Sequence, residues 1–186
     1  PVTSAAAQAL GAEPLKQETS LSYSLGLVLQ PAERVYLTID AYQIDIDDRI
    51  VLSSNLNLLG NAAAQALLAN LGITGVTSAR YFNNAIDTRT RGVDLVGSYS
   101  IPLQASSLDL TASYNYNKTE VTRVAPNPDA LIALGTNLLR MGRDEKGRIE
   151  EGAPRDKFAF TGNWQLAQWG FNGGITRYGR FTNRHA

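Results

Sequence analysis

The sequence predicts an all-β fold: an antiparallel up-and-down meander of about six strands that forms part of a larger transmembrane β-barrel. Three observations predict it: strict apolar–polar alternation in several segments, connections that alternate between short and long, and two tryptophans beside one short turn. Alternation at every second residue gives a strand one apolar and one polar face. In an up-and-down transmembrane barrel, the apolar face meets lipid, and short turns alternate with long outer loops.

The clearest alternation lies in residues 108–121. One parity is apolar or aromatic and the other is polar: Leu108, Leu110, Ala112, Tyr114 and Tyr116 against Asp109, Thr111, Ser113, Asn115 and Asn117. A soluble sheet with one solvated face produces the same alternation. This segment alone therefore leaves a soluble and a membrane sheet open. In the membrane case, the apolar parity faces lipid and the polar parity faces the lumen.

Two strands are predicted in the first quarter of the chain, after an Ala-rich segment that predicts a loop or a short helix. Residues 20–29 alternate regularly, and Gln30–Arg34 is a tight connection because proline suits turns. In residues 35–50, the apolar residues change parity after Ala41. A bulge near Ala41 explains this change, and so does a strand whose far half has left the bilayer.

The third predicted strand spans residues 79–101 and carries two arginines on its apolar parity. Arg89 and Arg91 share the parity of Val93. An arginine at the bilayer midplane costs roughly 2–4 kcal/mol, so this parity cannot continue in lipid. Either Gly92 marks a bulge, or the arginines lie beyond the hydrocarbon.

Two further alternating segments, residues 158–166 and 169–176, are joined by the tight turn Ala167–Gln168. Trp164 and Trp169 flank this turn on the apolar parities, which is the place of an aromatic girdle at a membrane interface. The connections run short, long, short, long and short along the chain. Together these features favour a membrane barrel over a soluble sandwich.

The two long connections are residues 51–78 and 122–153. The first contains four residues at helical spacing, which predict a short amphipathic helix within a long loop: Ala63, Leu67, Leu68 and Leu71. The second contains charged clusters beside glycines and predicts an exposed excursion such as a small hairpin. Its acidic and basic residues are interpreted as solvated surface.

The composition excludes several classes of site. The chain has no cysteine, and its 17 Lys and Arg residues equal its 17 Asp and Glu residues, which argues against thiolate metal sites and nucleic-acid binding. The single histidine, His185, supports neither a catalytic triad nor a zinc cluster. Asp45, Asp47 and Asp48 resemble a calcium loop, but Arg49 stands where an oxygen ligand is needed. We therefore predict no enzyme activity and no catalytic, cofactor-binding or metal-binding residues, and the sequence names no substrate-binding residue.

Three segments resemble strand motifs of TonB-dependent outer-membrane receptors. Residues 15–26 resemble the motif LKPE-x-S-x-x-Y-x-x-G, with Gln17 in place of the usual proline. Residues 42–50, YQIDIDDRI, resemble a Y-x-I-x-I-x-D-R-I strand. Residues 83–95 resemble an N-A-x-x-x-x-x-R-G-V-E/D-L strand. The order of these motifs along the chain makes the resemblance specific.

The resemblance implies a barrel of about 22 strands with a plugged lumen, to which this chain contributes about six strands near the C-terminal end. Residues 1–186 would then be a partial barrel domain without the plug domain, the TonB box and the closing strand. The start at Pro1, without methionine, is also interpreted as a cut. The implied function is that of a Gram-negative outer-membrane receptor fragment. Its solute is scarce, such as an iron–siderophore complex, and its partners are outer-membrane lipid and the TonB system.

The alternative is a soluble β-rich binding or interaction module with residues 51–78 and 122–153 as recognition loops. The two hypotheses differ in the environment of the apolar parities. A barrel fragment exposes a continuous apolar surface and needs detergent, whereas a soluble module does not.

Overall fold

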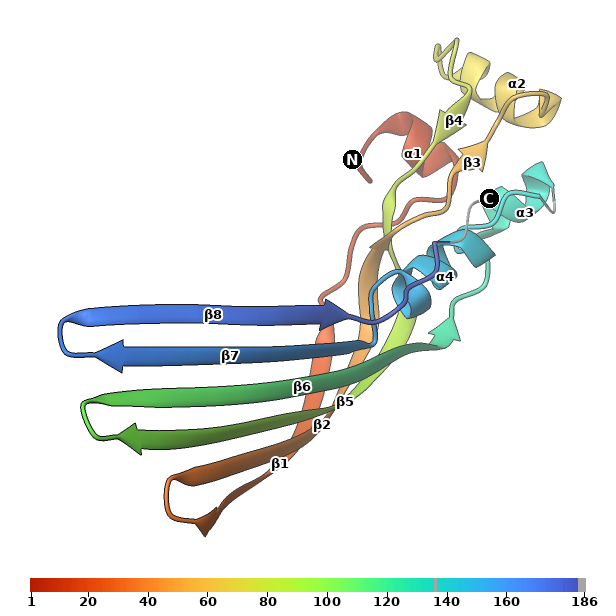
Figure 1. Cartoon of the computed structure of the whole chain (residues 1–186). Helices are drawn as coiled ribbons and strands as arrows, with labels where there is room; N and C mark the ends of the chain where they lie inside the picture. The colour runs from red at the N-terminus through yellow and green to blue at the C-terminus, as the bar shows by residue number, and fades with distance from the viewer. Residues whose placement is uncertain (136, 184–186) are drawn as a thin grey trace.

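The computed structural model describes residues 1–135 and 137–183 and consists mainly of one six-stranded antiparallel sheet (Figure 1). The strands pair in the order β1-β2-β5-β6-β7-β8 and span Thr19–Ala32, Val35–Leu52, Phe82–Leu103, Ser106–Val124, Asp156–Leu166 and Trp169–Tyr178. A short second pair, β3 (Leu56–Asn57) and β4 (Ser78–Ala79), lies within one long connection. The predicted six-stranded antiparallel meander is confirmed, with β1 and β8 as the two edges of the sheet.

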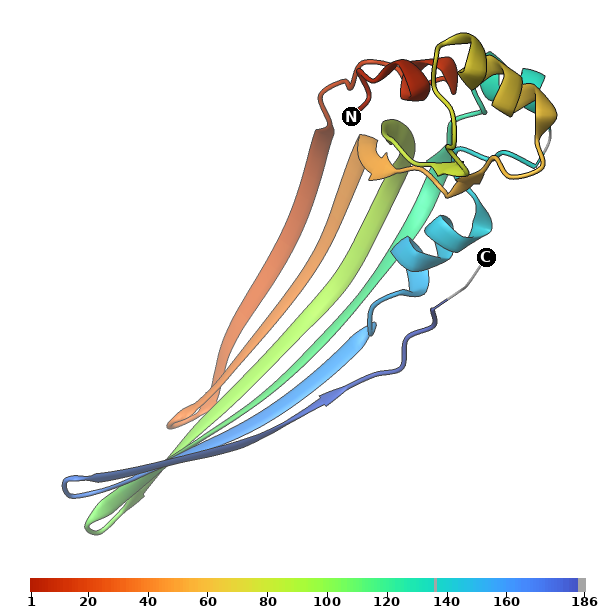
Figure 2. The same cartoon turned by 90° about the horizontal axis from the view of Figure 1, so that it is seen from above.

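The connections separate to opposite ends of the sheet (Figures 1 and 2). The three short turns, β1–β2, β5–β6 and β7–β8, lie together at one end. Arg34 and Ala167 adopt positive φ angles of 64° and 50°, which lets the chain reverse within two residues. The long connections and the segment before β1 lie at the other end. The predicted alternation of short and long connections is therefore confirmed.

The predicted apolar parities share one face of the sheet, which we call the apolar face. Residues that pair directly across an antiparallel sheet point to the same side. One such line of partners runs across five strands: Leu27, Ile39, Leu95, Tyr114 and Phe158. Leu110 has the parity of Tyr114 and so faces the same way as Leu27. The opposite side, which we call the polar face, carries the other parity.

The bulges expected near Ala41 and Gly92 are wrong. Ala41 pairs regularly with Leu25 and Val93, and Gly92 pairs regularly with Tyr42. The glycine at 92 is needed for another reason, because a Cβ there would overlap the Tyr42 ring. The change of parity after Ala41 is therefore not a change of pairing, which leaves the second alternative, a change in the surroundings of the strand.

The register of β2 does shift farther along, between Ile46 and Ile50. Asp48 lies in this irregular stretch and adopts a positive φ of 51°. The facing strand pair shifts at the same level, between Asp87 and Thr88. These two irregularities mark the place where the regular sheet gives way to the long connections.

The described residues form four short helices at the long-connection end: α1 (Ala5–Ala9), α2 (Ala62–Asn70), α3 (Asp129–Leu134) and α4 (Arg143–Glu151). Side chains cap two of them, since Ser4 Oγ accepts from Ala7 N at 3.3 Å and Asn61 Oδ1 accepts from Ala64 N at 3.0 Å. The predicted helix in the first long connection is confirmed as α2, although of the four residues named for it only Leu68 is buried. The hairpin expected in the second is wrong, because α3 and α4 form there.

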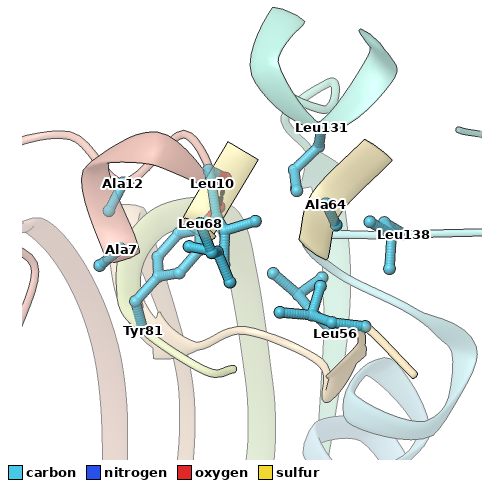
Figure 3. Close-up of a cluster of buried hydrophobic side chains, with 10 residues drawn as sticks. Ala7, Leu10, Ala12, Leu56, Ala64, Leu68, Tyr81, Leu131 and Leu138 are labelled. Carbon is cyan, nitrogen blue, oxygen red and sulfur yellow. Dashed lines mark hydrogen bonds between the residues drawn. The ribbon is translucent and has the colours of Figure 1, made fainter. Parts of the chain in front are cut away.

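Residues 1–14, 53–81 and 125–142 share one buried cluster, and we call these three segments the cap. Figure 3 shows side chains from all three meeting in it. Its buried members are Ala7, Leu10, Ala12, Leu56, Leu58, Ala64, Leu68, Tyr81, Leu131 and Leu138. The Tyr81 hydroxyl donates to the Leu10 carbonyl at 3.0 Å, and burial raises the pKa of Tyr81. The cap is thus a packed unit and not a set of separate loops.

Candidate functional site

The apolar face carries a band of apolar side chains that crosses all six strands, which we call the apolar band. On β1 the band ends at Leu21, whose line of partners leads through Asp45 to Arg89 of β5. On β8 it ends at Ile175, whose line of partners leads through Phe160 and Ala112 to Gly97. The edge of the band is therefore slanted relative to the strands.

The slope of this edge follows from strand geometry. The edge moves eight residues along β5, from Arg89 to Gly97, across five strand-to-strand steps. At about 3.3 Å per residue and about 4.8 Å per strand, the slope is about 45–50°. Transmembrane β-strands tilt by about 45°. An apolar band level with a membrane would slant across tilted strands in this way.

Beyond the band, the same face becomes charged, and we call this zone the collar. It comprises Gln43, Asp45, Asp87, Arg89, Arg91, Lys118, Glu120 and Arg123. Arg89 Nε contacts Asp45 Oδ1 at 2.5 Å, and Arg123 Nη2 contacts Asp48 Oδ1 at 3.0 Å. Arg89 and Arg91 thus lie past the end of the apolar band, as the sequence allowed.

We call the six-stranded sheet the wall. Three motifs that resemble those of the family meet between the wall and the cap, in a set of contacts that we call the junction. Asn84 donates to the carbonyls of Lys16 and Asp48, and its own Oδ1 accepts from Lys16 N at 2.8 Å. Glu18 Oε1 accepts from Ile50 N at 2.5 Å. These residues come from the segments 15–26, 42–50 and 83–95. The motifs therefore join the irregular part of β2 and β5 to the chain that enters β1.

The polar face carries hydrogen-bonded pairs of short polar side chains. Asn115 donates to Asp94, and Thr90 and Thr119 share a hydrogen bond of 2.9 Å between their hydroxyls. Hydrogen-bonded side chains of this kind tolerate water, as the interior of a transmembrane barrel requires.

An open cavity of about 1060 Å³ lies at the long-connection end, and we call it the loop-end cavity. Three arginines from separate segments line it, Arg143, Arg155 and Arg180. Ser54 fixes one side of the cavity, because its Oγ accepts from Gly142 N at 2.7 Å and donates to Asp144 Oδ1 at 3.1 Å. The cavity has the size of a metabolite site, and its three arginines face two carboxylates in the same lining, Asp144 and Glu151.

Helix α4 borders this cavity and is held by charged side chains. The buried carboxylate of Glu145 pairs with Arg80 of the cap and with Arg148, the latter at 3.1 Å. Glu150 Oε1 accepts from Val121 N at 2.9 Å, which covers the edge of β6 beyond the end of β7. Sequence reasoning missed these contacts because it treated the charged cluster as solvated surface.

Two further findings concern the part of the chain that the structure describes. It holds no group of three or more His, Asp or Glu side chains that could bind a metal. Asp45 and Asp48 pair with different arginines, Arg89 and Arg123. His185 lies outside the described residues. None of the helices in residues 1–135 and 137–183 has the length and apolarity to cross a membrane.

Comparison with known proteins places the chain in a family. The family model described as TonB dependent receptor-like, beta-barrel, matches residues 2–185. No curated protein matches the chain significantly. The family match covers the wall, the collar, the junction and the cap together.

Proposed function

Because the chain belongs to the TonB-dependent receptor β-barrel family, we propose that its six strands form part of the wall of a Gram-negative outer-membrane receptor. The receptor takes up a scarce solute, such as an iron–siderophore complex, with energy from the TonB system. Residues 1–186 are then a part of the barrel domain, and the plug domain, the TonB box and the closing strand belong to other parts of the receptor. The slanted apolar band is the observation that carries this proposal.

The apolar face supports a membrane location through its exposure. Leu25 is 79% exposed and Trp169 is 64% exposed. A soluble module would place these side chains in water, and soluble monomers rarely expose apolar patches above a few hundred Å². In a bilayer, lipid covers these side chains and keeps them out of water, so their exposure to the surroundings is not unfavourable. The soluble-module alternative is therefore disfavoured, although the cap would suit either environment.

The loop-end cavity is the proposed contribution of this chain to solute binding. It lies at the end with the long connections, which in this family face the outside of the cell. Arginines bind oxygen-rich anionic groups through charge-assisted hydrogen bonds. The family is one of transport receptors, so we propose that the chain is not an enzyme.

The test uses the full-length receptor in a strain that lacks its own copy. Cells are supplied with a panel of siderophores carrying radioactive iron, and uptake is measured with and without an active TonB system. We expect TonB-dependent uptake of at least one member. We further expect that replacing Arg143, Arg155 and Arg180 with glutamine weakens solute binding at least fivefold, about 1 kcal/mol.

The control variant is Arg34→Gln, which changes a cation at the short-turn end, away from the cavity. It should bind solute like the wild type. Receptor that sediments as a soluble monomer without detergent would contradict the membrane proposal and restore the soluble module. A membrane-embedded receptor whose cavity variants bind solute normally would contradict only the role of the cavity.

A further inference from the structure

Two cations stand directly opposite each other where the apolar band ends. Arg91 of β5 and Lys118 of β6 are cross-strand partners on the apolar face, one step beyond the last band residues Val93 and Tyr116. Directly opposite side chains in an antiparallel pair have Cβ atoms about 4.5–5.5 Å apart, and like charges in this arrangement are destabilising. This pair therefore needs an explanation.

At the neighbouring position of the collar, a cation faces anions instead of another cation. Arg89 faces Glu120 on β6 and Asp45 on β2, so each of its cross-strand partners is acidic. Arg91 instead donates to the neutral Gln43 Oε1 at 2.8 Å. Lys118 Nζ reaches along its own strand to Glu120 Oε1 at 2.5 Å. Glu120 is shared in this way, and no acidic residue of the described collar stands between Arg91 and Lys118.

The position of the pair indicates what could lie between the two cations. In the proposed membrane orientation, the first residues beyond the hydrocarbon lie at the level of the lipid headgroups. A phosphate group placed there would meet both cations at once. Arginine offers a planar fork that matches two phosphate oxygens, and lysine adds a compact point charge.

We propose that Arg91 and Lys118 together bind the phosphate of an anionic lipid headgroup in the leaflet at the long-connection end. This proposal rests on the proposed function, because it needs the apolar face to lie in a bilayer. The bound phosphate turns a repulsive cross-strand pair into an attractive site. It also fixes the depth at which the wall sits in the membrane.

The test measures lipid binding to the folded full-length receptor. Native mass spectrometry in neutral detergent gives the apparent affinity for phosphatidic acid, with zwitterionic phosphatidylcholine as the reference lipid. Each cation near a membrane surface contributes about 1 kcal/mol, so Arg91→Gln or Lys118→Gln should weaken phosphatidic acid binding roughly fivefold. The double variant should lose about thirtyfold. The control Lys146→Gln, on α4 outside the wall, should bind like the wild type.

A second measurement separates this site from a merely structural role. In neutral detergent, Lys118→Gln relieves the repulsion and loses only the exposed ion pair with Glu120, which contributes little to stability. Its melting temperature should therefore be equal to or above that of the wild type. With phosphatidic acid, the same variant should melt below the wild type. A shift of the same sign in both conditions would overturn the proposal. Competition by millimolar inorganic phosphate as effective as competition by the lipid would also overturn it, since the source would not be a headgroup.

Folding is checked in every case by heat-modifiable gel mobility. A wild-type receptor that never inserts into membranes contradicts the proposed function. An inserted receptor whose single and double variants all bind phosphatidic acid like the wild type contradicts this inference alone.

Discussion

The wall and the cap use the same kinds of apolar side chain in opposite ways. On the wall, Leu25 and Leu27 are 79% and 52% exposed, whereas Leu10 and Leu58 of the cap are fully buried. Protein packing alone removes the leucines of the cap from water. The leucines of the wall are removed from water only where lipid covers them. The stability of the wall therefore depends on whether lipid or water surrounds it, whereas the cap is stabilised by its own buried core.

The two regions also satisfy their backbone differently. The wall pairs almost every strand residue with a neighbouring strand, so its hydrogen bonds need no particular side chain. The cap relies on short helices and on side chains that bond to backbone, such as Ser53 Oγ, which accepts from Tyr81 N at 3.1 Å. Units held in this way can open locally while the rest of a protein remains folded.

The largest effect should come from charging the apolar face of the wall. Ala112 lies on the apolar face and Ser113 on the polar face of β6, at adjacent positions. Ala112→Arg places a guanidinium in lipid at a cost of roughly 2–4 kcal/mol near the midplane, so barrel assembly should fail. Ser113→Arg points into the wet lumen and should assemble. Heat-modifiable gel mobility of outer-membrane extracts measures the folded fraction.

These two variants can contradict the assignment of the apolar face of the wall to lipid and of its polar face to the lumen. Failure of Ser113→Arg with normal assembly of Ala112→Arg would reverse the two faces. Normal assembly of both would mean that β6 does not lie in a membrane. In that case the exposed leucines of the wall would need a protein partner instead of lipid.

Much of the wall could be predicted from sequence because period-two alternation needs only the polarity of each residue. The sequence also showed a change of parity after Ala41, but it could not say whether pairing or surroundings changed. The register answers this, because β2 pairs regularly with both neighbours around Ala41, and its pairing with β5 shifts only near Asp48. The sequence of one strand does not show how the neighbouring strands pair with it at a given residue.

The cap was much less predictable, for two physical reasons. Its core joins residues far apart in the chain, such as Leu10 and Tyr81, and no local pattern reports such contacts. Helix α4 has the sequence RDEKGRIEE, with almost no apolar face, and is held through the buried carboxylate of Glu145. Likewise, the arginines of the loop-end cavity come from separate segments that only the fold brings together.

A smaller, local effect should follow from opening the core of the cap. Leu68 is 1% exposed, so Leu68→Ala leaves a cavity and should destabilise the cap by about 2–5 kcal/mol. The control Leu71→Ala, at the end of the same helix and 49% exposed, should cost little. Limited proteolysis of the folded receptor should cut residues 53–81 faster in Leu68→Ala only. If the whole barrel lost its heat-modifiable mobility, the cap and the wall would be one cooperative unit and the comparison would fail.

The smallest effect concerns the collar, where β2, β5 and β6 meet beyond the apolar band. Asp87 accepts from the Arg123 guanidinium at 2.9 Å and from Asp48 N at 2.9 Å, and these hydrogen bonds hold the pKa of Asp87 below its ordinary value. A lowered pKa means that the folded state favours the charged carboxylate. Its contribution to stability is therefore complete above the ordinary pKa of about 3.9 and is lost as pH falls through the lowered pKa.

Asp87→Asn removes this titration and keeps the shape of the side chain. Because the Arg123 side chain is 49% exposed, the variant should be less stable than the wild type by no more than about 1 kcal/mol at neutral pH. The difference should shrink as pH falls below about 4, since the wild type then loses the same interaction. Urea unfolding midpoints of the detergent-solubilised receptor, measured from about pH 7 to about pH 3, give the comparison. A difference that stays constant down to the lowest pH would mean that the charge on Asp87 does not stabilise the collar, and that the hydrogen bond from Asp48 N is sufficient to hold β2 and β5 together at this level.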